Sequence, residues 1–562
     1  MLNDNNIKDI IQCYFKQKNI LVDHQVNSYD DFVDNIFPQI ISQFFPLKIN
    51  GNDNIKNISI NIENIRVEKP YYTENNGCSK VMTPNIARIR NHTYSLSIII
   101  DVIVQYIIIE NGNQIAIPDK IIKDVLFCKL PIVIKSKYCL SNNDILSECK
   151  YDMGGYTIIN GNEKVLITQE KIVPNIIQVH VNSKESSKYS YISEVRSCSS
   201  KIFGITKSLS IRMTNKKGYN NKLYVSFPHL KKDIPVFVLF KALGCITDKE
   251  IVYHIIDNNN SESDKMILKI IRESLIESSE YKTEYDNINY IMKNINHINS
   301  SFNDSMKFTY CKNILNKDIL PHLENSNSKK IHFMGLMINK LIKCYMGIEE
   351  VSNRDSLYNK RMETCGVLMG NLTFQCVNKI VKDIKTFVVK EISTGLWSVN
   401  NNYYEIINEL NIYKMIKNTY IENTLKGALA TGNWGMKNNI NKQGVSQVLN
   451  RLTFLSTISH MRRVSTPIDS TGKLIAPRKL QNTQWGYICP SETPEGQSVG
   501  VVKNLANSCE ITNEISSDII CEKIEEFIQY IDDIDIYQLN KTSLVKVFIN
   551  GNILGYTKYP KE

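Results

Sequence analysis

The residues from Lys426 to Asn504 decide how this 562-residue chain is interpreted. They include KGALATGNWG (426–435), GVSQVLNR (444–451), SHMRRVSTPIDSTGKLIAPRKLQNTQWG (459–486) and CPSETPEGQSVGVVKN (489–504). Between Lys426 and Lys503 there are ten Lys or Arg residues and three acidic ones, so this stretch supplies +7 of the chain's formal charge of +10. The positive charge of the whole chain is therefore concentrated here.

Turn-forming residues separate these cations, which places most of them on loops. Glycine or proline recurs through the stretch, as at Gly432, Gly444, Pro477 and Gly496. Cations on short, stiff loops suit a polyanion backbone, because each one that neutralises a phosphate also releases condensed counterions. The alternative is a solvated surface without a nucleic acid partner, since scattered charges usually face water. Charge alone leaves both interpretations open.

The order of several longer motifs favours the first interpretation. They are Ala430–Gly435 (ATGNWG), Gly444–Arg451 (GVSQVLNR), His460–Arg463 (HMRR), Gly472–Leu474 (GKL), Pro477–Arg478, Trp485–Gly486 and Cys489–Gln497 (CPSETPEGQ). Together they closely resemble the fork region of the second-largest subunit of multisubunit DNA-directed RNA polymerases, the counterpart of the bacterial beta subunit, in a eukaryotic-like form. Several long motifs in one order are far more specific than any single short motif.

A second motif that resembles the same family lies upstream, at 152–167 (DMGGYTIINGNEKVLI). Its Gly154–Gly155 pair could suggest a phosphate cradle, but no helix that opens with Lys-Ser or Lys-Thr follows it, which excludes a P-loop. Lys164 and the cations at 88–90 and 135–137 lie in similar family-like context. We expect these cations to be surface scaffold rather than DNA contacts.

The resemblance implies that the fork positions nucleic acid. It places the loop 436–443 near the upstream part of an RNA–DNA hybrid and the loop 469–478 near the downstream edge, where strands separate. The nucleic-acid-binding residues that it implies are Lys437, Lys442, Gln447, Arg451, Arg462, Arg463, Lys473, Arg478 and Lys479. Lys473, Arg478 and Lys479 are expected at the downstream duplex, because a strand-separating tip needs cations aimed at phosphates. The residues expected around the hybrid are Gln447, Arg451, Arg462 and Arg463.

Other polar residues of the fork are expected to have structural roles. His460 precedes two arginines, whose charge disfavours its protonation, so we interpret it as a structural hydrogen-bonding residue rather than a general base. Glu492 and Glu495 lie in a Pro-Gly loop among cations. We expect both to form ion pairs with neighbouring arginines.

No catalytic or metal-binding residue is predicted in this chain. In the family that it resembles, magnesium is held by an Asp-rich motif of the NADFDGD kind on the largest subunit, and this chain has no such motif. Its one dense acidic cluster, at 532–535, is interpreted as a solvated helix end. The fourteen cysteines include no CxxC pair, so no structural zinc is expected.

Length and pattern predict an α+β, multidomain fold. A chain of 562 residues with 42% hydrophobic residues is long and apolar enough for roughly three or four domains. The resemblance implies a first, discontinuous domain and places the boundaries, namely protrusion at 1–175 and 367–428, lobe at 176–366, fork at 429–510, and the start of an external domain at 511–562.

Periodicity predicts several elements along the chain. Two apolar helical stripes near the N-terminus are expected in a core: Ile7, Ile10, Ile11, Tyr14 and Phe15, then Phe32, Ile36, Phe37, Ile40, Ile41 and Phe44. Short β segments are expected at 57–67, 93–109, 115–117 and 131–136, with the apolar run 97–109 as a buried strand pair that is too short to span a bilayer. Asn-Gly turns predict hairpins at 111–113, 160–162 and 550–552. Helices are expected at 372–391 and 403–417, an amphipathic one at 520–531, and exposed insertions at 257–264 and 296–305.

The sequence as a whole is interpreted as the N-terminal half of the second-largest subunit of a DNA-dependent RNA polymerase, not catalytic by itself. The expected partners are the largest subunit, the missing C-terminal half, other polymerase subunits, the DNA template and nascent RNA, with no membrane partner. The alternative is a non-catalytic nucleic-acid-binding or regulatory remnant of this subunit. Scattered cysteines without a signal peptide suggest an intracellular location. Nucleus, cytoplasmic transcription site and virion stay open, as do a split gene, an interrupted gene and a fragment.

Overall fold

The computed structural model describes residues 4–17, 19–50, 55–110, 113–140, 148–149, 151–182, 187–214, 221–256, 262–296, 303–395, 402–435, 442–468, 472, 474–534 and 544–561. The chain forms two compact units, Met1–Lys171 with Lys360–Glu514, and Ile172–Asn359 with Ile515–Glu562. Helices and mostly antiparallel sheets make up both units, which confirms the α+β, multidomain class and the discontinuous first unit. The residue ranges of protrusion, lobe, fork and external domain stay predictions. Among the helices of the described residues, none is long and apolar enough to cross a membrane.

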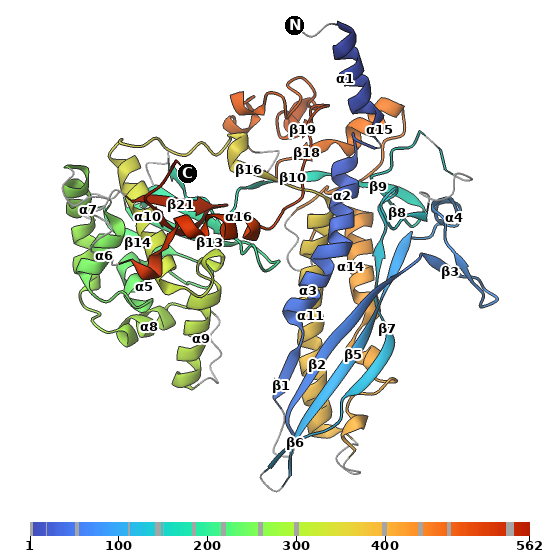
Figure 1. Ribbon diagram of the computed structural model, residues 1–562, viewed down its shortest axis with the longest axis horizontal. Coiled ribbons are helices and arrows are strands. Elements are labelled where there is room, and N and C mark those ends of the chain that lie inside the picture. Colours follow the sequence, from blue (N-terminus) through green and yellow to red (C-terminus); the bar gives the residue numbers. More distant parts are fainter. Residues whose placement is uncertain are drawn as a thin grey trace. The chain divides into compact units, whose positions relative to one another are not determined.

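A long antiparallel sheet dominates the first unit (Figure 1). Its strands are β1 (Leu47–Asn50), β2 (Ile55–Glu68), β5 (Ser95–Glu110), β6 (Asn113–Ala116) and β7 (Lys120–Pro131). The run 97–109 lies wholly within β5, so the predicted strand pair is one strand, which hydrogen-bonds to β2 on one side and to β6 and β7 on the other. Asp101 interrupts this apolar strand because its carboxylate accepts a hydrogen bond from Arg66 at 2.6 Å, beside a bulge in β2.

Three helices pack along this sheet, and α2 (Asp23–Asp31) packs on one of them. The three are α3 (Phe37–Phe44), α11 (Cys365–Thr394) and α14 (Asn418–Thr431), and Figure 1 shows them running beside β2, β5 and β7. The 30-residue α11 buries a side chain at every fourth position, namely Leu368, Leu372, Cys376, Ile380, Ile384, Val388 and Ile392. Residues four apart are neighbours on a helix but lie about 40° apart around its axis, so this apolar stripe winds around α11. Helix α11 contacts α2, α3 and α14 with it.

Two of the helical predictions for this unit are wrong. Helix α1 (Asp4–Lys16) has the predicted periodicity but buries no residue, and Ile10 is 57% exposed. The second stripe, from Phe32 to Ile41, is buried as predicted, with Phe44 half-buried. In the region 403–417, only a 3₁₀ turn and the four-residue α13 (Ile412–Met415) form. There Asn408 and Asn411 each accept the other's backbone N–H at 2.8 Å, and such side-chain bonds compete with a helix.

The Asn-Gly hairpins that lie in the described residues are confirmed. Asn160 and Gly161 have φ values of 50° and 79° and join β8 (Thr157–Ile159) to β9 (Asn162–Leu166). Asn550 and Gly551 have φ values of 49° and 80°. The predicted hairpin tip at 111–112 lies outside the described residues, as do most of the predicted insertions. The strand predicted at 131–136 does not form, because β7 ends at Pro131.

Short elements around the fork complete the first unit. One sheet has the order β16 (Lys360–Glu363), β10 (Thr168–Ile172), β18 (Arg463–Ser465) and β19 (Val502–Asn504). A second sheet joins β17 (Ser446–Val448) to β9 and β8. The remaining elements are α4 (Pro84–Ile89), α15 (Phe454–Met461) and the pair β3 (Tyr71–Thr73) and β4 (Ser79–Val81). Segments far apart in the sequence therefore meet in these two small sheets.

The second unit is a five-stranded antiparallel sheet with helices. Its strands follow chain order: β11 (Gln178–Val181), β12 (Tyr189–Ser197), β13 (Lys207–Thr214), β14 (Leu223–Ser226) and β15 (Ile234–Pro235). The helices are α5 (Val236–Ala242), α6 (Asp248–Ile255), α7 (Glu262–Ser278), α8 (Glu284–Lys293), α9 (Asp304–Lys317) and α10 (Asn327–Tyr345). Every residue of α5 and twelve of the nineteen residues of α10 are buried, and both helices contribute to its core.

The C-terminal segment of this unit differs from the prediction of one amphipathic helix at 520–531. It forms α16 (Asp518–Ile524), a 3₁₀ turn and β20 (Gln529–Tyr530), which pairs with β22 (Asn552–Thr557) beside β21 (Val545–Ile549). Ile520 is 55% exposed, whereas Ile531 is buried. Ile531 is buried because it lies in a second 3₁₀ turn, Ile531–Asp533, which packs on α10 and β22. The apolar residues of the segment thus belong to three elements rather than to one helix face.

Candidate nucleic-acid interface

The ATGNWG motif contains the C-terminal end of helix α14, which packs against β17. Helix α14 ends at Thr431, and Gly432 follows with a φ of +77°. A Cβ at Gly432 would lie 2.5 Å from the carbonyl oxygen of Ser446, so glycine is required there. The hydroxyl of Ser446 donates to the carbonyl of Leu429 at 2.7 Å. The indole N–H of Trp434 donates to a carbonyl of α11 at 3.1 Å, which fixes the next turn.

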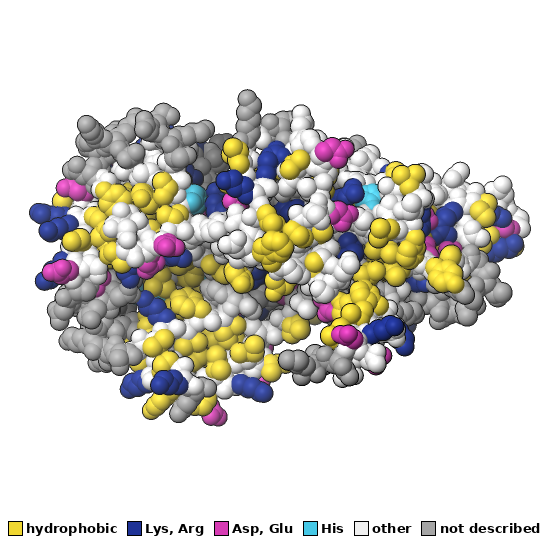
Figure 2. Space-filling model, turned by 90° about the horizontal axis from the view of Figure 1, so that it is seen from above, with side chains coloured by type: hydrophobic (Ala, Val, Ile, Leu, Met, Phe, Trp, Pro, Cys, Tyr) yellow, Lys and Arg dark blue, Asp and Glu magenta, His cyan; other side chains and the backbone are white. Residues whose placement is uncertain are grey.

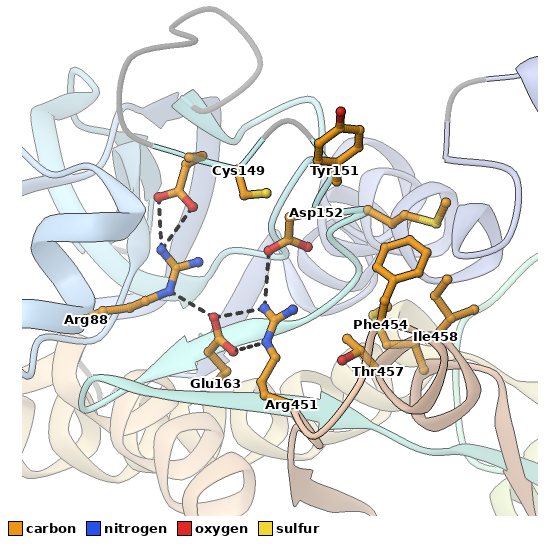
Figure 3. Close-up of a pocket in the computed structure, with 12 residues that line it drawn as sticks. Arg88, Cys149, Tyr151, Asp152, Glu163, Arg451, Phe454, Thr457 and Ile458 are labelled. Carbon is orange, nitrogen blue, oxygen red and sulfur yellow. Dashed lines mark hydrogen bonds and ion pairs between the residues drawn. The ribbon is translucent and has the colours of Figure 1, made fainter.

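Arg451, at the end of the GVSQVLNR motif, is held by two carboxylates of the 152–167 motif (Figure 3). Its Nε and Nη2 donate to Glu163 at 2.7 and 3.0 Å, and Nη2 also donates to Asp152 at 3.2 Å. The guanidinium carbon lies 5.0 Å from the centre of the Tyr156 ring. Two segments that resemble one family in sequence therefore meet at this arginine.

Arg88 of α4 extends this network. Its Nε donates to Glu163 at 2.9 Å, its Nη1 to Glu148 at 2.9 Å, and its Nη2 to the hydroxyl of Tyr156 at 2.7 Å. The Tyr156 hydroxyl in turn donates to Asp152 at 2.6 Å. Burial opposes the charge of Asp152, yet the hydrogen bonds from Tyr156 and the Gly154 N–H and the charge of Arg451 hold its pKa below the usual value. The Asp152 carboxyl therefore stays ionised.

A pocket of about 350 Å³ lies beside the network. Arg88, Asp152, Glu163 and Arg451 line one side, and Phe454 and Ile458 of α15 line another (Figure 3). Helix α15 begins at a capping box, in which Thr453 and Ser456 satisfy each other's backbone N–H groups. This cap sets the start of the helix and so the place of Phe454.

Gln447 and His460 form a hydrogen-bonded pair near the C-terminal end of α15. His460 is 5% exposed; its Nδ1 accepts the backbone N–H of Asn450 at 3.1 Å, and its Nε2 lies 2.9 Å from the side-chain oxygen of Gln447. Because Nδ1 accepts, Nε2 carries the proton and donates to Gln447. Burial, and then the charge of Arg463, lowers the pKa of His460 to about 4. The predicted structural role is confirmed, although burial contributes more than the arginine.

The two arginines of the HMRR motif differ in exposure. Arg462 is 3% exposed, and its guanidinium donates to the carbonyls of Leu21, Ala506 and Cys509 at 2.6, 2.5 and 3.3 Å. Arg463 lies in β18 and is half-buried, and its Nε has no hydrogen-bond partner among the residues that the structure describes. Arg462 therefore binds the chain's own backbone.

Some lysines of the basic stretch are likewise paired inside the first unit. Lys442 forms an ion pair with Glu363 of β16. Lys503 and Lys360 bind the buried carboxylate of Glu170 at 2.7 and 3.0 Å, and Thr466 donates to it at 2.8 Å. Burial alone would raise the pKa of Glu170, but the two lysines hold it below its usual value. These cations brace the β16–β10–β18–β19 sheet.

Arg478, expected at the downstream duplex, holds its own loops together. Its Nη1 donates to the carbonyls of Gln497 and Val499 at 2.6 and 3.0 Å, Nη2 to that of Gly472 at 3.1 Å, and Nε to that of Leu474 at 3.2 Å. The guanidinium thus spans the loop before it and the PEGQS segment after it. A contact of this residue with DNA stays a prediction.

Of the remaining three candidates, one is exposed and two lie outside the residues that the structure describes. Lys479 is exposed and forms no ion pair within the described parts of the chain. Lys437 and Lys473 lie outside the described residues. The expected pairing of Glu492 and Glu495 with arginines is wrong for the chain as described. Glu492 instead accepts a hydrogen bond from Ser459, because the start of its loop folds against α15.

Sequence reasoning missed the partners of the candidate arginines. Glu163, Asp152 and Tyr156 belong to the motif at 152–167, and Arg88 is expected to be surface scaffold, but the sequence does not predict their contact with Arg451. The sequence signal for this contact is charge. The segment 152–163 contains two acidic residues and no basic one, whereas the stretch from Lys426 to Lys503 is basic. Within the ranges that the structure describes, no group of three or more His, Cys, Asp or Glu residues could hold a metal ion.

Two family models match the sequence of this chain. Residues 20–422 match the family described as "RNA polymerase beta subunit", and residues 447–511 match "RNA polymerase Rpb2, domain 3". The chain belongs to the RNA polymerase beta subunit family. Both halves of the Arg451–Glu163 contact lie in regions that match this family.

Individual relatives show which part of the subunit is present. The chain is 34% identical to "DNA-directed RNA polymerase II subunit 2" of Arabidopsis thaliana, over 98% of this chain and 47% of the relative. It is 30% identical to "DNA-directed RNA polymerase subunit Rpo2N" of Methanocaldococcus jannaschii, over 93% of this chain and 98% of the relative. A viral relative, "DNA-directed RNA polymerase subunit 2" of Acanthamoeba polyphaga mimivirus, is 32% identical over 97% of this chain and 46% of its own length. The chain therefore spans about half the length of many curated relatives and corresponds to their N-terminal half.

Proposed function

We propose that this chain is the N-terminal portion of the second-largest subunit of a DNA-dependent RNA polymerase and that its fork positions the RNA–DNA hybrid and the downstream duplex. The observation that carries the proposal is the match to polymerase subunits over nearly the whole chain, at 34% and 30% identity. The fork motifs that suggested nucleic acid binding lie inside the matched regions.

The contacts of the candidate residues support two roles within the fork. Lys479 is exposed, which supports a phosphate contact, whereas Arg463 is half-buried and its Nε, which has no partner among the described residues, is buried. Arg462 and Arg478 donate to backbone carbonyls, which supports a role in holding the loops that carry other contacts. Arg451 combines both roles. Its Nε and Nη2 donate to the chain's own carboxylates, whereas its Nη1 has no partner among the described residues.

In this proposal, the chain needs partner subunits for catalysis. The largest subunit would hold the Mg²⁺ that positions phosphates during nucleotidyl transfer. The C-terminal half of the subunit, other polymerase subunits, the DNA template and nascent RNA complete the expected assembly. The chain then serves as one side of the DNA cleft.

Purification of the tagged chain from its native source tests the proposal. We expect a largest subunit and the remaining half of the second-largest subunit to co-purify, together with Mg²⁺-dependent RNA synthesis on nicked DNA. Recovery of the chain alone, or with DNA but without activity, would instead support the non-catalytic remnant.

Salt dependence tests the electrostatic part separately. If fork cations meet phosphates, the affinity of the chain for DNA falls steeply with salt, because counterions are released on binding. Lys479→Ala should lower both the affinity and the salt slope. A flat salt response would show that these charges do not meet phosphates.

A further inference from the structure

The pocket beside Arg451 has a polar side and an apolar side that face the same space (Figure 3). Its volume of about 350 Å³ lies within the range of roughly 300–1,000 Å³ that is typical of small-ligand sites. Phe454 is 60% exposed and Tyr151 is 68% exposed, and both line the pocket. Exposed aromatic rings beside a pocket suit a flat ligand that stacks on them.

The charge of the pocket argues against a phosphate. Its lining contains three carboxylates, from Glu148, Asp152 and Glu163, and two guanidinium groups, from Arg88 and Arg451, so its formal charge is −1. Both guanidinium groups already bind carboxylates. An anion would therefore meet more repulsion than attraction, unlike at Lys479, which has no acidic partner among the described residues.

The polar side presents acceptors next to a donor. Asp152 and Glu163 accept hydrogen bonds through oxygens that have further lone pairs, and their side chains are only 12% and 18% exposed. The Nη1 group of Arg451 makes no hydrogen bond within the described part of the chain, although the other two nitrogens of its guanidinium do. A matching ligand edge has N–H donors beside an acceptor.

We infer that this pocket binds an unpaired guanine base of a nucleic acid strand. The N1–H and N2–H groups of guanine would donate to the carboxylates, its O6 would accept from Arg451 Nη1, and its ring would stack on Phe454. Adenine fits poorly, because its N1 lone pair would face a carboxylate. The inference rests on the proposed function, since it names what part of the nucleic acid this side of the fork takes.

The test uses the 562-residue chain with GMP, AMP and ribose 5-phosphate as probes, followed by saturation-transfer NMR or equilibrium dialysis. GMP should bind at least threefold more tightly than AMP, and ribose 5-phosphate should not compete. Equal competition by ribose 5-phosphate would show that the site reads phosphate and would overturn the inference. Equal affinity for GMP and AMP would overturn the assignment of the base edge.

Phe454→Ala and Leu455→Ala form a matched pair of variants. Leu455 is the next residue on α15 and is 75% exposed, but it does not line the pocket. Stacking of a base on an aromatic ring is worth roughly 1–3 kcal/mol, so Phe454→Ala should weaken GMP binding at least fivefold while Leu455→Ala changes little. Equal behaviour of the two variants would overturn the inference. Both side chains are mostly exposed, so neither change should unfold the chain.

Failure of this inference is distinguishable from failure of the proposed function. If the chain co-purifies with an active polymerase but Phe454→Ala binds GMP as tightly as the unchanged chain does, the base pocket is wrong and the subunit assignment stands. If no polymerase is recovered but GMP binding follows the predicted order, the pocket stands and the assembly does not.

Discussion

Arg451 donates two hydrogen bonds to Glu163, at 2.7 and 3.0 Å, across 288 residues of sequence. Glu163 is shared, because Arg88 donates to the same carboxylate at 2.9 Å. One acidic side chain thus ties helix α4 and the segment before α15 to the β8–β9 hairpin. The position of α15, and with it the place of Phe454 and His460, depends on this carboxylate.

Glu163→Gln should lower the free energy of unfolding of the chain. The change leaves two arginines without a full charge partner, and the loss is expected to be about 1–3 kcal/mol. The value stays at the lower end because Arg451 is partly exposed to water, which screens the pair. Urea denaturation measures it. Glu495→Gln is the control, because Glu495 is exposed; an equal effect of both variants would contradict the role of Glu163.

Acid should destabilise the chain through His460. Its pKa is about 4 in the folded protein and 6.5 when unperturbed, so between these values the unfolded chain binds a proton that the folded one does not. The stabilisation is therefore complete above pH 6.5 and is lost as the pH falls toward 4, by on the order of 2 kcal/mol. Unfolding free energies at pH 4–7.5 measure this slope. Buried His24, His254 and His322, whose pKa values are also lowered, add to it.

His460→Gln should reduce the pH slope while keeping the fold. Glutamine is neutral at all these pH values and still offers one donor and one acceptor in the place of the imidazole. The difference between the two stability curves isolates His460 from the other histidines. Parallel curves for the two proteins would show that His460 does not titrate in this range.

Gly432→Ala should destabilise the helix end that carries the ATGNWG motif. The new Cβ would lie 2.5 Å from the carbonyl oxygen of Ser446, and the residue would keep a positive φ, so a loss of about 1–3 kcal/mol is expected. Gly427→Ala is the matched control inside α14. Nothing lies within 4 Å of its added Cβ, so this change should stabilise the helix by about 0.5–1 kcal/mol. Thermal unfolding distinguishes the opposite signs.

Arg478→Ala should slow elongation or disturb strand separation in an assembled polymerase while leaving assembly intact. The guanidinium holds four backbone carbonyls, and its loss would loosen the loops on both sides of it. Elongation on a scaffold template measures the effect, and normal rates would count against any role. Arg478→Lys keeps the charge but cannot span four carbonyls, so a defect in both variants indicates positioning and rescue by lysine indicates charge.

The family and the general class of this chain were accessible from its sequence. Motifs such as ATGNWG and GVSQVLNR can be recognised, together with their order along the chain, without any knowledge of contacts. Local rules also sufficed for the Asn160–Gly161 hairpin, because a type I′ turn needs positive φ at both positions and Asn and Gly tolerate it. The same holds for the long stripe of α11, whose four-residue spacing is a local property.

Tertiary structure alone decided which cations are available to a partner. Arg462, Arg478 and Lys479 look alike in a charge count, yet the first two donate to the chain's own carbonyls and only Lys479 is exposed without an ion pair among the described residues. Helix α1 shows the same limit, because its apolar face is periodic but none of its residues is buried in the described part of the chain. Sequence periodicity and charge are local, whereas burial and pairing depend on segments that lie up to several hundred residues away. The fold therefore determines which of the chain's many positive charges can meet a phosphate.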